Sequence, residues 1–229
     1  MELRLDTLKA ALCAAFFFAG AVLGVDAVRA EGGPARALLE AATNGDVAAI
    51  GKSLAAGVAV DARDAQGRTP LLLATHKNRI EAARALIAAG ADVNAKDSIE
   101  DSPFLYAGAE GRNEILVMTL RAGADLKSLN RYGGTALIPA AHHGHPETVK
   151  ILLGTAIDKD HVNKLGWTAL LEAILLGDGG PVHTQIVRSL VAAGANVNIA
   201  DRDGVTPLQH ARRSGYTAMV AIVAAAVGR

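Results

Sequence analysis

Aromatic residues and cysteine are scarce in this sequence. Only 3% of its 229 residues are aromatic, although 51% are hydrophobic. The interior must therefore be built from alanine, leucine, valine and isoleucine, which suits small and closely spaced helices. The single cysteine, Cys13, lies in an apolar run near the N-terminus.

A surplus of charge of one sign is also missing. Lysine and arginine together number 23, and so do aspartate and glutamate, so the formal net charge is zero. A chain without a broad basic field is poorly suited to phosphate backbones, and we expect no nucleic-acid partner. No run of like charges and no low-complexity tract indicates a disordered tail.

The sequence lacks the motifs of the common catalytic sites. It contains no Gly-x-Ser-x-Gly, His-Glu-x-x-His, phosphate-binding loop or dinucleotide glycine fingerprint. Its glycine pairs, Gly133–Gly134 and Gly179–Gly180, follow no predicted buried strand and indicate turns. We therefore expect a protein that is not an enzyme and binds no cofactor.

The N-terminus has the pattern of a secretory signal peptide. Arg4 and Lys9 precede an uninterrupted apolar run, 10–25, and small residues stand at Val28 and Ala30. The run is shorter than the ~20 residues that span a bilayer. We predict a signal peptide over residues 1–30 and a periplasmic or secreted protein. The alternative that the segment is retained as a signal anchor stays open, and this anchor would be the protein's only contact with a membrane.

The remaining chain is organised around one unit, 67–97. Thr69 suits a helix N-cap, and Pro70 fills the first helical position, where no amide hydrogen is needed. The chain reverses near Asn78. A second helix then carries an apolar stripe made by Ile80, Ala83, Leu86 and Ile87. Gly90 ends this helix, as expected for a left-handed residue after a C-cap.

This unit recurs at a nearly constant step. The candidate caps are Thr69, Ser102, Thr135, Thr168 and Thr206. The first four are evenly spaced, and only the last interval is longer. The first unit, which begins at Pro34, has Arg36 at the cap position. A terminal repeat lacks one neighbour, so this departure suits a capping role.

A helix–turn–helix unit of about 33 residues that starts with Thr-Pro-Leu and ends with Gly-Ala-Asp-Val-Asn resembles the ankyrin repeat. The resemblance covers Pro34 to Val227. It implies an all-α solenoid of helix pairs with hairpin-like fingers, a right-stacked linear array, over residues 31–229. The expected repeats are residues 34–63, 64–96, 97–129, 130–162, 163–200 and 201–227. It also implies a non-enzymatic module that binds a partner protein, of unknown identity, on its fingers and first helices.

Four departures from the unit predict local irregularities. Glu100 replaces the turn glycine, so we expect a distorted finger there. Pro139 lies four residues after Thr135 and should delete the first hydrogen bond of that helix. Ala156 stands where a stop glycine is expected, so we expect a rebuilt loop that uses Gly154. The inserted residues 178–182 should form a protruding surface loop.

The predicted protein-binding surface comprises finger and first-helix residues that are expected to face outward. The finger residues are Arg68, Ile99, Asp101, Tyr132, Leu165, Trp167 and Val205. Trp167, the only tryptophan, and Tyr132 are expected to form an apolar strip with Leu165 and with Leu175 or Leu176. Arg131, Lys164 and Arg202 would rim it. Buried tryptophan and tyrosine anchors are typical of interface hot spots. The alternative is that Trp167 merely packs against the next finger.

The histidines allow a second interpretation. His142, His143, His145 and His183 are closely spaced in equivalent regions of neighbouring repeats. Such a group favours a metal-handling protein that binds zinc or copper. The alternative is that these are surface histidines, with His142 and His143 part of the protein-binding surface, since no cysteine or fixed carboxylate completes a ligand set.

The last helix, residues 217–227, is apolar nearly all round, although a terminal repeat normally turns a polar face to water. Self-association through this helix is therefore a further interpretation.

Overall fold

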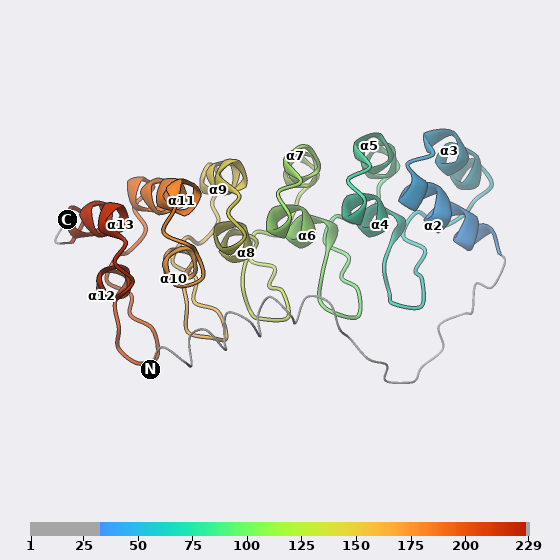
Figure 1. Ribbon diagram of the computed structural model, residues 1–229. Coiled ribbons are helices and arrows are strands. Elements are labelled where there is room, and N and C mark those ends of the chain that lie inside the picture. The colour runs from blue at the N-terminus through green and yellow to red at the C-terminus, as the bar shows by residue number, and fades with distance from the viewer. Residues whose placement is uncertain (1–32, 228–229) are drawn as a thin grey trace.

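Residues 33–227, the part of the chain that the computed structural model describes, form twelve α-helices and no strand. The predicted signal peptide, residues 1–30, lies outside them. The helices stack as six antiparallel pairs in an elongated array (Figure 1). The first helices of the pairs are α2 (Pro34–Asn44), α4 (Pro70–His76), α6 (Pro103–Ala109), α8 (Leu137–His142), α10 (Ala169–Leu175) and α12 (Pro207–Arg213). The predicted all-α solenoid is confirmed.

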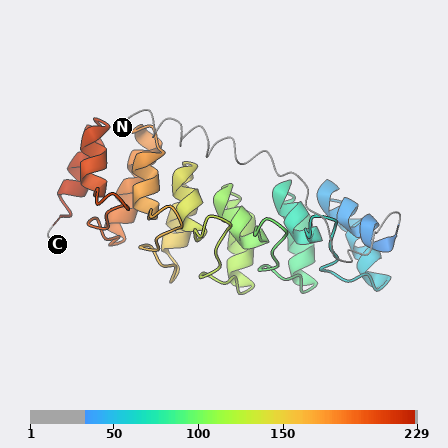
Figure 2. The same cartoon turned by 90° about the horizontal axis from the view of Figure 1, so that it is seen from below.

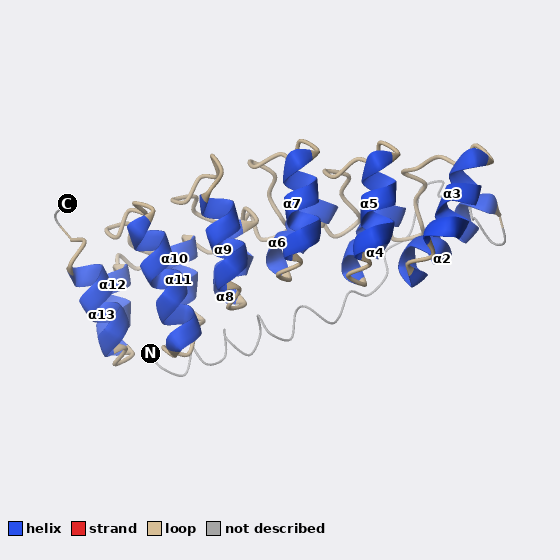
Figure 3. Ribbon diagram, turned by 90° about the horizontal axis from the view of Figure 1, so that it is seen from above, coloured by secondary structure: helices blue, strands red, loops and turns tan. Residues whose placement is uncertain are grey.

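The second helices form a separate layer above the first (Figure 1). They are α3 (Val47–Ala55), α5 (Ile80–Ala88), α7 (Asn113–Arg121), α9 (Pro146–Leu153), α11 (Pro181–Ala192) and α13 (Thr217–Ala224). Loops that we call fingers connect each second helix to the next first helix and project from the array. Viewed from below and from above, the pairs follow one another along a gently curved line (Figure 2, Figure 3).

Four of the five predicted N-caps hold their helices as expected. The hydroxyls of Thr69, Ser102, Thr168 and Thr206 accept the amide three residues later at 3.2 to 3.3 Å. In α12 the side chain of Gln209 also accepts the amide of Thr206 at 2.8 Å, which completes a capping box. The start of each of these helices is therefore determined locally.

The prediction that Thr135 is an N-cap is wrong. Its hydroxyl has no hydrogen-bond partner, and α8 begins two residues later, at Leu137. The disturbance predicted from Pro139 is present, and it is larger than the loss of one hydrogen bond.

The second helices of four repeats end at glycines in the left-handed region. Gly57, Gly90, Gly123 and Gly194 have φ between 81° and 89°. In the fourth repeat the loop is rebuilt, but not through Gly154, whose φ of −75° is right-handed. The side chain of Thr155 forms the hydrogen bonds that end the helix instead.

The Thr155 hydroxyl donates to the carbonyl of Leu152 at 2.6 Å and accepts the amide of Ile157 at 3.2 Å. These two hydrogen bonds replace the backbone bonds that a left-handed residue would allow.

The finger at Glu100 is not distorted, contrary to expectation. Glu100 adopts φ of 68°, close to the 77° of Gly67 at the equivalent position. The Asp97 carboxylate accepts the amides of Ile99 and Asp101, both at 3.0 Å, and holds the turn. The finger thus keeps its shape, and Glu100 carries the backbone strain.

The insertion protrudes less than predicted. Pro181 occupies the first turn of α11, so this helix has 12 residues and absorbs part of the inserted chain. Proline is well suited to that position because its missing amide hydrogen would have no helical acceptor. Only residues 176–180 remain between α10 and α11.

One aliphatic core runs between the two helix layers through every repeat, as the composition predicts. Phe104 is the largest of its fully buried side chains. The array ends at α13, which buries Met219 and Val223 and exposes Ala218 and Ala221. Within residues 33–227 no helix combines the length and hydropathy of a membrane span.

Candidate functional site

The candidate site is the surface that the first helices and the fingers share, which we call the inner face. Side chains of neighbouring repeats contact one another on this surface at two places. The rings of His76 on α4 and Tyr106 on α6 lie 4.0 Å apart. His142 on α8 lies 3.8 Å from the carboxyl group of Glu172 on α10.

In repeat five the inner face carries an apolar cluster that is separate from the main core. Trp167, Leu171 and Leu175 form it, and Leu165 and Leu176 pack against them half-buried. Trp167 is only 8% exposed, so the expectation that it faces outward is wrong. Trp167 stands immediately before the cap Thr168, outside α10, and its side chain packs with Leu171 and Leu175 of that helix.

The other predicted finger residues are not part of this cluster. Tyr132 is not among the residues that pack in this cluster, and Arg131 lies over its ring, 4.9 Å from the centroid. Arg68 pairs with Asp64 at 2.7 Å. Ile99 is 38% exposed at its finger tip.

The predicted basic rim connects the fingers to one another. Lys164 donates to the carbonyl of Arg131 at 3.0 Å, and the Arg202 guanidinium donates to the carbonyl of Lys164. Arg131 lies 3.5 Å from the carboxylate of Asp101 in the preceding finger. Burial raises the pKa of Asp101 to about 6, although Arg131 opposes this. These cations hold the fingers in register.

Glu172 is the inner-face residue that sequence reasoning missed. It is 4% exposed on α10, and its Oε1 accepts a hydrogen bond from the Asn163 side chain at 2.7 Å. Burial raises the pKa of Glu172 to about 8, and the bond from Asn163 only partly offsets this. A lone glutamate in the run Leu-Leu-Glu-Ala-Ile-Leu was the available signal.

His142, whose Nδ1 lies 3.8 Å from Oε2 of Glu172, is not its counter-ion at neutral pH. Burial, with smaller contributions from His143 and His183, lowers the pKa of His142 to about 4. Both members of the pair are therefore uncharged near pH 7.

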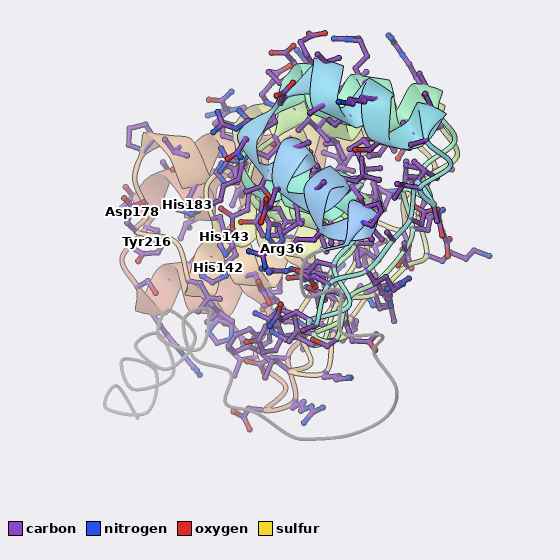
Figure 4. The ribbon with its side chains drawn as sticks, turned by 90° about the vertical axis from the view of Figure 1, so that its right-hand side faces the viewer. Arg36, His142, His143, Asp178, His183 and Tyr216 are labelled. Atoms are coloured by element: carbon purple, nitrogen blue, oxygen red, sulfur yellow. The ribbon has the colours of Figure 1, made fainter. Side chains whose placement is uncertain are left out.

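The histidines serve as links between repeats. Figure 4 labels His142, His143 and His183. Nδ1 of His143 lies 2.7 Å from the carbonyl of Ala109, at the end of α6. Nε2 of His183 lies 3.0 Å from the carbonyl of His142, and Nδ1 of the same ring lies 3.2 Å from the carboxylate of Asp178.

The His145 ring, in turn, lies against the backbone of Gly111 in the preceding repeat. Among residues 33–227 no three His, Cys, Asp or Glu side chains are arranged to hold a metal ion. The metal-handling interpretation gains no support from this geometry.

The fold and the inner face define a class of protein: a helical repeat array whose fingers and first helices form one extended surface. A family model for ankyrin repeats (3 copies) matches residues 13–97 and 104–201. The chain belongs to the ankyrin repeat family, whose members are generally non-enzymatic and bind partner proteins. No curated protein matches the chain.

Solved structures agree with this assignment. An ankyrin repeat domain from Acinetobacter baumannii AYE is 58% identical, with a TM-score of 0.81 over 82% of this chain and 96% of that one. The ankyrin repeat protein EF0377 is 46% identical, with a TM-score of 0.80 over 83% and 97%. The ankyrin repeat domain of Bcl-3, a member of the IkappaB family, is 27% identical, with a TM-score of 0.75 over 84% and 86%.

Proposed function

We propose that this chain is an exported, non-enzymatic module that holds a partner protein on its inner face. The observation that carries the proposal is the apolar cluster of repeat five, because it lies outside the core that stabilises the array. Its half-buried members, Leu165 and Leu176, are the side chains that a partner would cover. Completing the burial of such half-buried residues at an interface is worth about 1 kcal/mol each.

The test is capture of a partner by variants of this cluster. The full chain, tagged at its C-terminus, is incubated with the exported protein fraction of its own cells, and the bound proteins are identified by mass spectrometry. We expect Leu165→Arg combined with Leu176→Arg to abolish capture. Trp167 is left intact, since replacing a buried tryptophan would also destabilise the repeat.

Val182→Arg is the matched control. Val182 is 45% exposed on α11, so the same change in chemistry is made on the other helix layer. Circular dichroism should show equal helix content in all variants. Equal capture of the same proteins by the double variant would reject the inner face as the binding surface.

Export depends on residues 1–30, which lie outside the described residues. Periplasmic or secreted localisation predicts that the protein recovered from cells begins at Glu31. Cell fractionation and the intact mass of the chain test this. A full-length chain in the cytoplasm would contradict export, whereas a full-length chain in the membrane fraction would indicate a retained anchor.

Self-association through α13 is a separate proposal. It is supported by the absence of charged residues in this helix and by Val227, which is 47% exposed. Light scattering at increasing protein concentration distinguishes a monomer from an oligomer, and a monomer at high concentration would reject it.

A further inference from the structure

One position recurs on the inner face of every repeat from the second onward, four residues after the cap. Its occupants are Leu73, Tyr106, Pro139, Glu172 and His210. Two of these five carry a titratable group that is almost completely buried, Glu172 at 4% and His210 at 8% exposure. Buried ionisable groups need partners, and the two repeats meet this need differently.

Repeat six pairs its buried group with a charge. Nε2 of His210 lies 2.7 Å from the carboxylate of Asp201, which stands five residues before the cap. The residue at that place in repeat five is Asn163, which donates to Glu172 at 2.7 Å. An amide can satisfy an oxygen of the carboxyl group, but it cannot balance a negative charge. Repeat five therefore lacks the counter-ion that repeat six has.

No helix packed against α10 supplies the missing cation, and the finger cations Arg131, Lys164 and Arg202 bind to other groups. Helices α8, α11 and α12 pack against α10, and within the described residues none of their side chains forms a salt bridge with Glu172 except the contact from His142. The histidines on these helices are His142, His183 and His210, and the last two are paired with Asp178 and Asp201. The arginines of α11 and α12 are exposed to solvent.

A second carboxylate, Glu110 at the end of α6, forms a salt-bridge contact only with a histidine among the described residues. Glu110 of repeat three lies 3.8 Å from Nδ1 of His143, and no lysine or arginine of the described residues forms a salt bridge with it. Beside Glu172, the apolar cluster presents Leu176 and Leu165. The charge that would complement an ionised Glu172 is positive, and the side chain that packs on Leu165 and Leu176 would be aliphatic.

We propose, on the basis of the proposed function, that the partner presents a lysine or arginine side chain to Glu172, flanked by an aliphatic side chain that packs on Leu165 and Leu176. The basic group would supply the charge that Asn163 cannot. The occupant is thus a short basic and aliphatic segment of an exported protein.

The chemistry of Glu172 gives this pairing a signature. Burial raises the pKa of its carboxyl group to about 8 in the free chain, and a bound cation lowers it again. Binding then releases a proton, so the affinity should increase as the pH rises toward 8. Changing Glu172 to glutamine keeps the hydrogen bond from Asn163 and removes this dependence.

The experiment selects twelve-residue peptides from a random phage-displayed library on the purified full-length chain at pH 8.5. We expect enriched peptides to contain Lys or Arg beside Leu, Ile or Val. A synthetic copy of the best peptide should bind Glu172→Gln about tenfold more weakly, which is about 1.4 kcal/mol. The control Glu147→Gln changes an exposed carboxylate on α9 and should leave binding unchanged.

Two results would overturn the inference: enriched peptides without a basic residue, or equal affinity for Glu172→Gln. A library that yields no bound peptide also counts against it, because a single short segment is what we propose. The proposed function fails separately, if the double arginine variant of Leu165 and Leu176 binds the peptide and the exported partner normally. Peptides that need Leu165 and Leu176 but not Glu172 would reject only the inference drawn here.

Discussion

Pro139 leaves the buried hydroxyl of Thr135 without a hydrogen-bond partner four residues earlier in the chain. In the other repeats the amide four residues after the cap donates to the carbonyl of the cap residue. The amide of Leu73, for example, donates to the carbonyl of Thr69 at 3.0 Å. Proline has no amide hydrogen, and the amide of Ile138 bonds to the Thr135 carbonyl at 3.2 Å instead. The hydroxyl therefore loses its usual donor, and α8 is shortened to six residues.

Replacing this proline should stabilise the array. We expect Pro139→Ala to restore both the capping bond and the first helical bond, and to raise the free energy of unfolding by about 1–2 kcal/mol. For a chain of this size each kcal/mol corresponds to about 2–4 °C in Tm. Differential scanning calorimetry measures this change in Tm. Pro146→Ala, at the first position of α9, is the control and should give no gain. A lower Tm for Pro139→Ala would contradict this account of Thr135.

The strained finger of repeat three makes a second prediction. Glu100 has φ of 68°, a conformation that costs a non-glycine residue roughly 1 kcal/mol. Its ion pair with Lys96 at 3.1 Å is exposed and offsets little of this cost. Glu100→Gly should therefore stabilise the protein by about 0.5–1 kcal/mol in urea denaturation. The reverse change, Gly204→Glu in the finger of repeat six, should destabilise it by a similar amount. Equal midpoints for all three chains would show that the turn carries no strain.

Features set by a few neighbouring residues could be predicted from the sequence. The helix starts after Thr69, Ser102, Thr168 and Thr206 follow from a hydroxyl and the amides one turn away, and they are found where expected. The even spacing of the caps was sufficient to predict the stack, because each pair can bury its apolar face only against the next pair.

Features set by contacts between helices could not be predicted. The orientation of Trp167 depends on how its side chain packs against α10, and the sequence alone does not place it relative to Leu171 and Leu175. The pKa of Glu172 is raised because other residues exclude water from a side chain that would be exposed on an isolated helix. Periodicity indicates which residues share a face, but not how deeply a particular side chain is buried.

The state of Glu172 predicts how stability depends on pH. Its usual pKa of 4.5 applies in the unfolded chain, and burial raises it to about 8 in the folded chain. Between these values the folded chain keeps a proton that the unfolded chain releases, so this group makes stability fall as the pH rises. Glutamine does not titrate. The Tm of Glu172→Gln should therefore exceed that of the parent by a margin that grows from pH 5 to pH 8.

Burial, His143 and His183 lower the pKa of His142, and Glu172 is not among these causes, so we expect the contribution of His142 to cancel in this comparison. Glu147→Gln on the surface of α9 provides the matched control, with no change in the pH dependence. A constant difference in Tm between the Glu172→Gln variant and the parent across this pH range would mean that Glu172 ionises normally.

The loop of the insertion predicts that alanine destabilises the protein by different amounts at two glycines that have nearly the same φ. Gly179 has φ of 72° and Gly204 has φ of 73°, so an alanine at either position carries the same backbone strain, about 1 kcal/mol. Their surroundings differ, since a Cβ at Gly179 would overlap the ring of Tyr216, whereas one at Gly204 meets nothing within 4 Å. The Tyr216 hydroxyl donates to the carbonyl of Gly177 at 3.1 Å and holds the ring over the loop.

Gly179→Ala must therefore displace Tyr216 as well as strain the backbone, and we expect it to cost about 1–3 kcal/mol more than Gly204→Ala in chemical denaturation. Combining Gly179→Ala with Tyr216→Ala separates the two effects, because the overlap disappears when the ring is removed. The added cost of Gly179→Ala in the Tyr216→Ala background should fall to the cost of Gly204→Ala. If it stays as large as in the parent chain, Tyr216 does not pack over the loop in solution.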